Sequence, residues 1–125
     1  MEPRSVLVVD DDLPMRQLLA SLFRDEGYRV EVEHSAMAAL AHAALTEFDA
    51  VLSDVNMPGA SGLELVRELK RVRPGTRVIL MSGRATRDGA EAARRAGAFD
   101  YLEKPFELER VHCAVGRAIE DRGRD

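Results

Sequence analysis

Five short apolar runs recur along the chain, and each is followed by a longer segment with helical spacing of apolar residues. These runs predict strands at residues 5–9, 28–32, 48–52, 77–81 and 98–102. The run at 28–32 alternates with charged residues, which is typical of an edge strand. The valine-rich first run is too short for a helix and suits a strand buried on both faces.

Start and stop signals predict helices between the strands. Asp12 is placed to cap a first helix that contains Pro14 in its first turn and ends at Gly27. Further helices are expected from Ser35 to about residue 45, from Ser61 to Pro74-Gly75, from Thr86 to about Ala96, and from Glu107 onward.

The apolar side chains of three helices predict which faces are buried. They are Leu18, Leu19, Leu22 and Phe23 in the first helix, Leu63, Leu65, Val66 and Leu69 in the third, and Leu108, Val111, Val115, Ala118 and Ile119 in the last. The fourth helix is alanine-rich, charged and weakly apolar, so it has little to anchor it. Residues 121–125 are charged or glycine and are expected to fray or to begin a linker.

Five strand–helix units in succession predict an α/β fold with a parallel sheet covered by helices on both faces. The flavodoxin-like (βα)5 arrangement, a doubly wound sheet of strand order 2-1-3-4-5, suits this number of units. In that order the ligand crevice lies at the carboxyl ends of the strands, near the reversal between the first and third. The second strand lies away from the crevice, so its end is expected to contribute no site residue.

Composition narrows the class of protein. The 125 residues suit a single domain over 1–125, with a core at about 4–120. The net charge of −4 argues against a nucleic-acid-binding face. There is neither an apolar stretch of about 20 residues nor a signal-peptide pattern, so we expect a cytoplasmic protein without membrane contact. Cys113, the only cysteine, is expected to be buried on the last helix.

Four predicted strands are followed by polar residues at the same edge of the sheet. These residues are Asp10 and Asp11, then Asp54, then Ser82 beside Gly83, and last Lys104. Carboxylates brought this close repel one another unless a cation lies between them, and Mg²⁺ is the natural choice because it prefers oxygen ligands. The backbone carbonyl of Asn56 could fill another coordination position. The sequence therefore predicts a site for a divalent metal and a phosphoryl group.

The acidic cluster also supplies a nucleophile. Asp54 stands alone at the end of the central strand, opposite the acidic pair, and is the best candidate to form an aspartyl phosphate. Lys104 and Ser82 are suited to contact phosphoryl oxygens, since phosphoryl transfer needs mainly positioning and charge neutralisation.

Four segments of the chain together resemble the receiver domain of two-component response regulators. They are VVDDD at 8–12, DVNMPGASG at 54–62, MSG at 81–83 and YLEKPF at 101–106, and the similarity covers about residues 4–120. The run at 97–106 most resembles receivers attached to σ54-dependent activators.

The resemblance implies a role for each site residue. Asp54 accepts a phosphoryl group from a histidine kinase or a histidine phosphotransfer protein. Asp11, Asp54 and the Asn56 carbonyl bind Mg²⁺ directly, while Asp10 acts largely through water. Lys104 contacts the phosphoryl group, and Ser82 moves to bond it. Tyr101 occupies the aromatic position that rotates with this movement.

The same resemblance implies an output. Phosphorylation would change a surface formed by the fourth helix, the fifth strand and the last helix. The partner of this surface would be either an output domain that controls transcription or a second copy. The domain would not be an enzyme beyond Mg²⁺-dependent self-phosphorylation and slow self-dephosphorylation. Arg84, two residues after Ser82, is placed to influence the lifetime of the phosphoryl group. The chain is either a stand-alone receiver or, as we favour, the N-terminal part of a longer regulator.

Two other functions fit parts of the pattern. Asp10-x-Asp12 superficially matches the start of haloacid-dehalogenase-type phosphatases, although Pro14 stands where those enzymes carry threonine or valine. A phosphorylation-independent interaction module of the same fold is the other alternative. His34, His42 and His112 have no metal-binding spacing, so surface or packing roles are expected.

Overall fold

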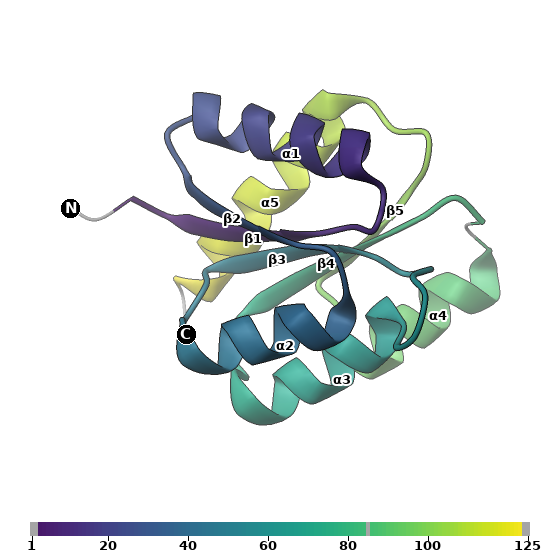
Figure 1. Ribbon diagram of the computed structural model, residues 1–125. Coiled ribbons are helices and arrows are strands. Elements are labelled where there is room, and N and C mark those ends of the chain that lie inside the picture. Colours follow the sequence, from purple (N-terminus) through teal and green to yellow (C-terminus); the bar gives the residue numbers. More distant parts are fainter. Residues whose placement is uncertain (1–2, 85, 124–125) are drawn as a thin grey trace.

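The computed structural model describes residues 3–84 and 86–123, in which five parallel strands form one sheet (Figure 1). The strands are β1 (Ser5–Val9), β2 (Arg29–Glu33), β3 (Ala50–Asp54), β4 (Arg77–Ser82) and β5 (Asp100–Glu103). Their order is β2-β1-β3-β4-β5, which confirms the predicted doubly wound arrangement.

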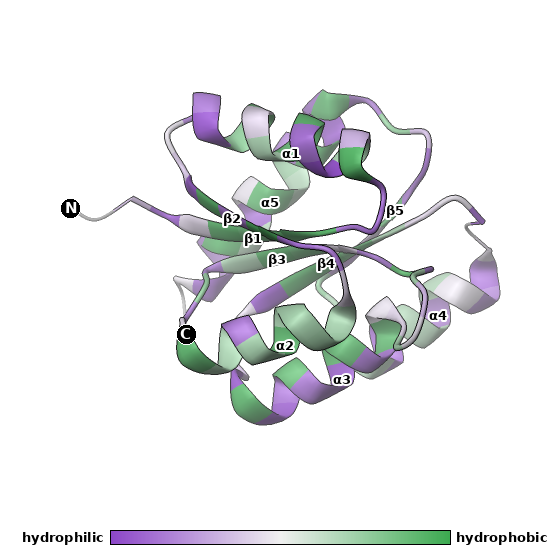
Figure 2. Cartoon of the chain, viewed as in Figure 1, coloured by the Kyte–Doolittle hydropathy of each residue, from purple (hydrophilic) through white to green (hydrophobic). Residues whose placement is uncertain are grey.

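Helices cover both faces of the sheet (Figure 1). On one face lie α1 (Leu13–Asp25) and α5 (Leu108–Arg122); on the other lie α2 (Ala36–Leu45), α3 (Gly62–Val72) and α4 (Arg87–Ala96). Successive strand residues point to opposite faces, so Val6 and Val8 pack in the core under α1 and α5, whereas Leu7 and Val9 pack under α2 and α3. Figure 2 shows hydrophobic residues along the strands of the sheet, whereas the helices carry both hydrophobic and hydrophilic residues.

The predicted helix starts are confirmed by side-chain caps. An oxygen of Asp12 accepts a hydrogen bond from the backbone N–H of Met15 at 3.2 Å. Ser35, Ser61 and Thr86 cap α2, α3 and α4 in the same way. These oxygens satisfy backbone donors that have no partner inside the helix. Glu107 precedes α5 without such a bond.

Three strands begin and end one or two residues later than predicted. As a result Glu33, Asp54 and Glu103 are the last residues of β2, β3 and β5. The predicted inner faces of two helices are also partly wrong. Leu18 of α1 is 47% exposed and Leu108 of α5 is 37% exposed. Leu19 and Phe23 of α1 and Val111 and Val115 of α5 are buried as predicted. Ala20 and Ala114 are buried beside them.

Two expectations for the C-terminal region are wrong. Cys113 is exposed, because the buried stripe of α5 passes through positions 111, 114, 115, 118 and 119 and leaves 113 on the outer side. The helix also continues through Arg122 instead of fraying at residue 121, and Asp121 and Arg122 form ion pairs. Residues 124 and 125 of the expected tail lie outside the described residues.

The fourth helix is anchored weakly, as predicted: Ala93 is the one buried side chain found in α4. Among the helices of residues 3–84 and 86–123, none combines the length and the apolar character that a bilayer crossing requires.

Candidate functional site

The carboxyl edge of the sheet brings the predicted residues together. Asp10 follows β1, Asp54 ends β3 and Ser82 ends β4, and all three are buried. Parallel register aligns these ends, since Asp54 pairs with Met81 and Ser82 pairs with Glu103, next to Lys104. The arrangement follows from the strand order, because β1, β3, β4 and β5 are consecutive neighbours.

Three carboxylates form a cluster that fits a cation. One oxygen each of Asp10, Asp11 and Asp54 lies within 4.8 Å of the other two. Asp11 is exposed, whereas the other two are buried, so the cluster opens to solvent on one side. Carboxylate oxygens at an open position suit Mg²⁺, which usually keeps several waters and takes one or two carboxylates.

Asp10 is held at four points by neighbouring segments. Its N–H donates to the carbonyl of Glu33 at 3.2 Å, and its own carbonyl accepts from Nη1 of Arg16 at 2.7 Å. Its Oδ1 accepts from the N–H of Asp12 at 2.9 Å, and its Oδ2 lies 3.3 Å from Nζ of Lys104. Asp10 is therefore a buried side chain in a fixed position, with each carboxyl oxygen already bonded. The sequence did not reveal the part of Arg16, nor that the main chain of β2 supports the site.

Asp54 is bonded through both carboxylate oxygens. Oδ1 accepts from the backbone N–H of Asn56 at 3.2 Å, and Oδ2 lies 3.2 Å from Nζ of Lys104. Burial raises the pKa of Asp54, the ammonium of Lys104 lowers it, and the Asp10 carboxylate raises it again, so the pKa lies above its ordinary value. A buried carboxylate that is bonded through both oxygens has a defined orientation. Its raised pKa means that ionisation is less favourable than in water.

Lys104 carries the positive charge that both buried carboxylates share. Burial lowers the pKa of Lys104, but Asp10 and Asp54 raise it by more, so the ammonium is retained. The backbone ties Lys104 to the neighbouring strand, since its N–H donates to the carbonyl of Ser82 at 2.8 Å. The hydroxyl of Ser82 accepts from the N–H of Arg84 at 3.1 Å. The ammonium and the hydroxyl thus lie on adjoining strand ends, as predicted.

Gly62, the first residue of α3, allows the chain after Asp54 to turn closely. Its N–H donates to the carbonyl of Val55 at 2.9 Å. A Cβ at this position would collide with the carbonyl oxygen of Asp54 and would lie 3.0 Å from Cα of Val55. Gly62 therefore positions the Asp54–Asn56 turn, a role that sequence reasoning missed although the residue closes the 54–62 segment.

Other candidates lie outside the cluster. Tyr101 is half-buried on β5 and Arg84 is exposed. Asp12 caps α1, so its side chain serves the helix and not the cluster. This geometry disfavours the Asp10-x-Asp12 phosphatase hypothesis, because the second aspartate of that pair is occupied. Two histidines have packing or surface roles. Nδ1 of His42 lies 2.8 Å from Glu33, and its ring packs edge-on against Phe48. Nε2 of His112 lies 3.6 Å from the partly exposed Glu26.

Comparison with known proteins identifies the family. The model of the response regulator receiver domain matches residues 6–116. The chain therefore belongs to the receiver domain family of response regulators. It is 40% identical over 108 residues to a response regulator receiver protein of Anaeromyxobacter sp. (strain Fw109-5), covering 86% of this chain and 45% of that protein.

Transcriptional regulators are among the relatives. The chain is 35% identical over 119 residues to the DNA-binding transcriptional regulator NtrC of Azospirillum brasilense, covering 95% of this chain and 25% of NtrC. The chain thus spans less than half the length of these two relatives. The structure also resembles the beryllofluoride-activated NtrC4 receiver domain dimer, with a TM-score of 0.89, 30% identity and coverage of 94% and 98% of the two chains. This agrees with the predicted resemblance to receivers of transcriptional activators.

Proposed function

We propose that Asp54 is the phosphoacceptor of this receiver domain and that a sensor histidine kinase, or a histidine phosphotransfer protein, is the donor. The observation that carries the proposal is the position of Asp54: it is 8% exposed and bonded to Lys104 and the Asn56 N–H beside two further carboxylates. In the reaction a carboxylate oxygen of Asp54 attacks phosphorus and the P–N bond to the donor imidazole breaks. The imidazole nitrogen keeps the electron pair and takes a proton from solvent.

The donor set at this edge fits Mg²⁺. Asp11, Asp54 and the backbone carbonyl of Asn56 would hold the ion directly, and Asp10, which lies in the same cluster, would act largely through water. When bound, the ion neutralises charge on the transferring phosphoryl group. Lys104 supplies a second positive charge on the same side and a point contact to a phosphoryl oxygen.

The proposed output is a change of the surface formed by α4, β5 and α5. Ser82 bonds the phosphoryl group, and Tyr101 moves together with Ser82. The charge of the phosphoryl group thus shifts the equilibrium between two states of this surface. Arg84, exposed two residues after Ser82, is placed to influence the lifetime of the phosphoryl group.

The relatives support two candidate partners for that surface. A homodimer is one candidate, because the NtrC4 receiver domain is described as a dimer in its activated form. An output domain that controls transcription is the other, because NtrC is a DNA-binding transcriptional regulator. We assign this domain residues 1–125, with the core at about 4–120, a cytoplasmic location and no direct contact of its own with nucleic acid or membrane.

The test is labelling of the purified chain with acetyl phosphate and Mg²⁺, followed by intact mass. We expect one added phosphoryl group in the wild type and none in Asp54→Asn. The matched control is Asp12→Asn, which removes a carboxylate from the same edge but keeps a side chain that caps α1. Labelling of Asp54→Asn at the wild-type rate would overturn the assignment of Asp54.

A second measurement separates the switch from a phosphorylation-independent interaction module. Binding of a dimer or output partner should increase with phosphodonor in the wild type and remain at the basal level in Asp54→Ala. Full binding by Asp54→Ala without phosphodonor would favour the alternative.

A further inference from the structure

Gly89, the third residue of α4, has no backbone reason to be glycine. Within the described residues, the glycines with positive φ are Gly27, Gly59 and Gly97. Gly89 therefore has a helical conformation that any L-amino acid adopts without strain. Alanine would stabilise this helix, because glycine loses more conformational freedom on folding. This loss of helix stability matters in α4, because the helix has ten residues and Ala93 is the one buried side chain found in it.

Space is what this position requires. A Cβ built on Gly89 would lie 2.7 Å from the hydroxyl oxygen of Tyr101 and 3.4 Å from Cζ of the same ring. It would also lie 3.1 Å from Oγ1 of Thr86, which caps α4 by accepting the Gly89 N–H at 2.9 Å. The first of these separations is closer than real Cβ atoms approach an oxygen, so something must shift.

The ring of Tyr101 is the part that can move. Its hydroxyl is the far end of a side chain with rotatable bonds, and the residue is only half-buried. The start of α4 is held by the Thr86 cap. The smallest adjustment to a side chain at position 89 is therefore rotation of Tyr101 away from α4.

We propose that the absence of a side chain at Gly89 makes room for the Tyr101 hydroxyl and thereby fixes the resting position of this ring between β5 and α4. Gly89 is thus a positioning residue that acts through Tyr101. What the ring position means for the partner surface rests on the proposed function; the contact between Gly89 and the hydroxyl does not.

The chain offers a matched control in Gly116 of α5. It also lies inside a helix without positive φ, and a Cβ there meets no atom within 4 Å. Gly89→Ala and Gly116→Ala therefore make the same chemical change in two helices. They differ in whether the new methyl group meets Tyr101 and Thr86.

The first experiment follows the ring by NMR with ¹³C-labelled tyrosine. The chain has two tyrosines, and Tyr28, which packs edge-on against Phe23, serves as the internal reference. We expect the Tyr101 ring resonances to shift in Gly89→Ala and to keep their wild-type positions in Gly116→Ala, with Tyr28 constant in both. Unchanged Tyr101 resonances in Gly89→Ala would overturn the proposal.

The second experiment is a double-mutant cycle with Tyr101→Phe, read by thermal unfolding. Gly116→Ala should raise Tm by about 2–5 °C, and Gly89→Ala should raise it less or lower it. In the Tyr101→Phe background Gly89→Ala should regain the rise seen for Gly116→Ala, because the closest oxygen is gone. The Thr86 contact remains in that background, so recovery identifies the hydroxyl as the obstacle. Equal effects of Gly89→Ala with and without the hydroxyl contradict it.

A third measurement tests whether Gly89 affects the proposed response to phosphorylation. If Tyr101 leaves its resting position on phosphorylation, Gly89→Ala favours the altered state and should be labelled by acetyl phosphate at a higher initial rate than Gly116→Ala. Equal rates would remove the functional part of the proposal. Failure of the wild type to label at all would instead count against Asp54 as acceptor, and the ring and stability results would stand apart from it.

Discussion

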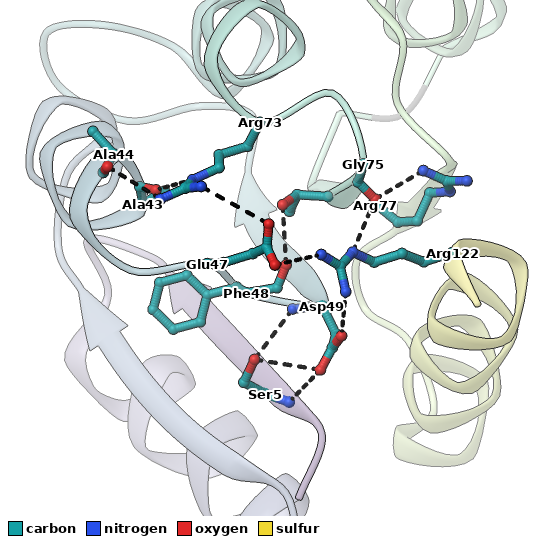
Figure 3. A network of polar contacts seen from close by, with 11 residues as sticks. Ser5, Ala43, Ala44, Glu47, Phe48, Asp49, Arg73, Gly75, Arg77 and Arg122 are labelled. Carbon is teal, nitrogen blue, oxygen red and sulfur yellow. Dashed lines mark hydrogen bonds and ion pairs between the residues drawn. The ribbon is translucent and has the colours of Figure 1, made fainter. Parts of the chain in front are cut away.

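The two ends of the sheet use the same residue types in opposite ways. At the carboxyl edge, Asp10 and Asp54 share the single ammonium of Lys104, with Asp11 close beside them. At the amino edge, Glu47 and Asp49 meet the guanidinium groups of Arg73 and Arg122 (Figure 3), and Asp121 meets that of Arg77. The first end holds excess negative charge, whereas at the second a network of three guanidinium groups faces three carboxylates.

Arg122, in the last turn of α5, is the centre of the amino-edge network. Its Nη1 lies 2.6 Å from Asp49, its Nη2 lies 3.1 Å from Glu47, and its Nε donates to the carbonyl of Gly75 at 3.1 Å (Figure 3). The other oxygen of Asp49 accepts from the N–H of Ser5 at 2.9 Å. Arg122 thus joins α5 to the segments before β3 and β4, and Asp49 extends the link to the start of β1.

Two further arginines extend this network. Nε of Arg77 lies 2.7 Å from Asp121, and Nε of Arg73 donates to the carbonyl of Ala43 at 2.9 Å, at the end of α2. Charges with partners and saturated hydrogen bonds favour the folded state, whereas crowded carboxylates oppose it and keep their affinity for a cation. The amino edge therefore contributes to stability, whereas crowded carboxylates at the carboxyl edge lower the stability at the candidate site.

The largest expected effect is on the amino edge. Arg122→Met removes the partner of Asp49, whose side chain is only 15% exposed, and should lower the free energy of unfolding. We expect a loss of about 2–3 kcal/mol in urea denaturation, because a largely buried carboxylate is left without its counter-charge. The control is Arg71→Met, which breaks an exposed pair with Glu68 and should cost no more than about 0.5 kcal/mol. Equal losses in the two variants would mean that the network contributes no more than a surface pair.

Mg²⁺ should partly reverse the destabilisation at the carboxyl edge. At about tenfold its dissociation constant, the ion should stabilise the wild type by about 1.4 kcal/mol, seen as a rise in Tm. The rise should be lost in Asp11→Asn and kept in Asp12→Asn, because Asp11 belongs to the carboxylate cluster and Asp12 caps α1. An undiminished rise in Asp11→Asn would place the ion elsewhere.

A smaller effect, of opposite sign to the first, is expected when Asp54 is neutralised. Asp54→Asn should raise the free energy of unfolding of the metal-free protein at pH 7, by less than Arg122→Met lowers it. The reason is that the pKa of Asp54 is raised in the folded state, so the ionised form opposes folding. Asparagine keeps an oxygen that can accept the Asn56 N–H.

The sign of the pH dependence follows from the same shift. Because the folded protein holds this proton more tightly than the unfolded chain, the contribution of Asp54 to stability increases as pH falls through its folded pKa. The advantage of Asp54→Asn over the wild type should therefore shrink toward acidic pH in urea titrations. An advantage that grows as the pH is lowered would show that Asp54 is stabilised as the anion.

The sequence predicted the carboxyl edge well because local patterns determine it. A buried strand followed directly by a polar residue places that residue at the strand end, and parallel order brings four such ends together. Asp10, Asp54, Ser82 and Lys104 were identified in this way. The cap role of Asp12 was also readable, because capping depends on residues three positions apart.

The amino edge was missed because its contacts join distant parts of the chain. Arg122 and Asp49 are 73 positions apart and Arg77 and Asp121 are 44 apart, and no periodicity links them. The charged end of α5 therefore looked like a fraying tail. Leu18 and Leu108 were misplaced for a different reason: a small rotation of a helix about its axis exchanges an edge position of the apolar stripe for its neighbour. A glycine that is required because a side chain would not fit, such as Gly62, cannot be recognised from the hydropathy pattern.

The exposure of Cys113 makes the natural chain ready for spectroscopy. It is the only cysteine, so a thiol-reactive dye or spin label would attach at one known point on the outer side of α5 without removal of other thiols. Its sulfur lies 3.8 Å from Glu109, one turn earlier on the same helix, so the probe would sit away from the buried stripe. Movement of α5 relative to its surroundings can then be followed through the attached label, and no residue has to be substituted first.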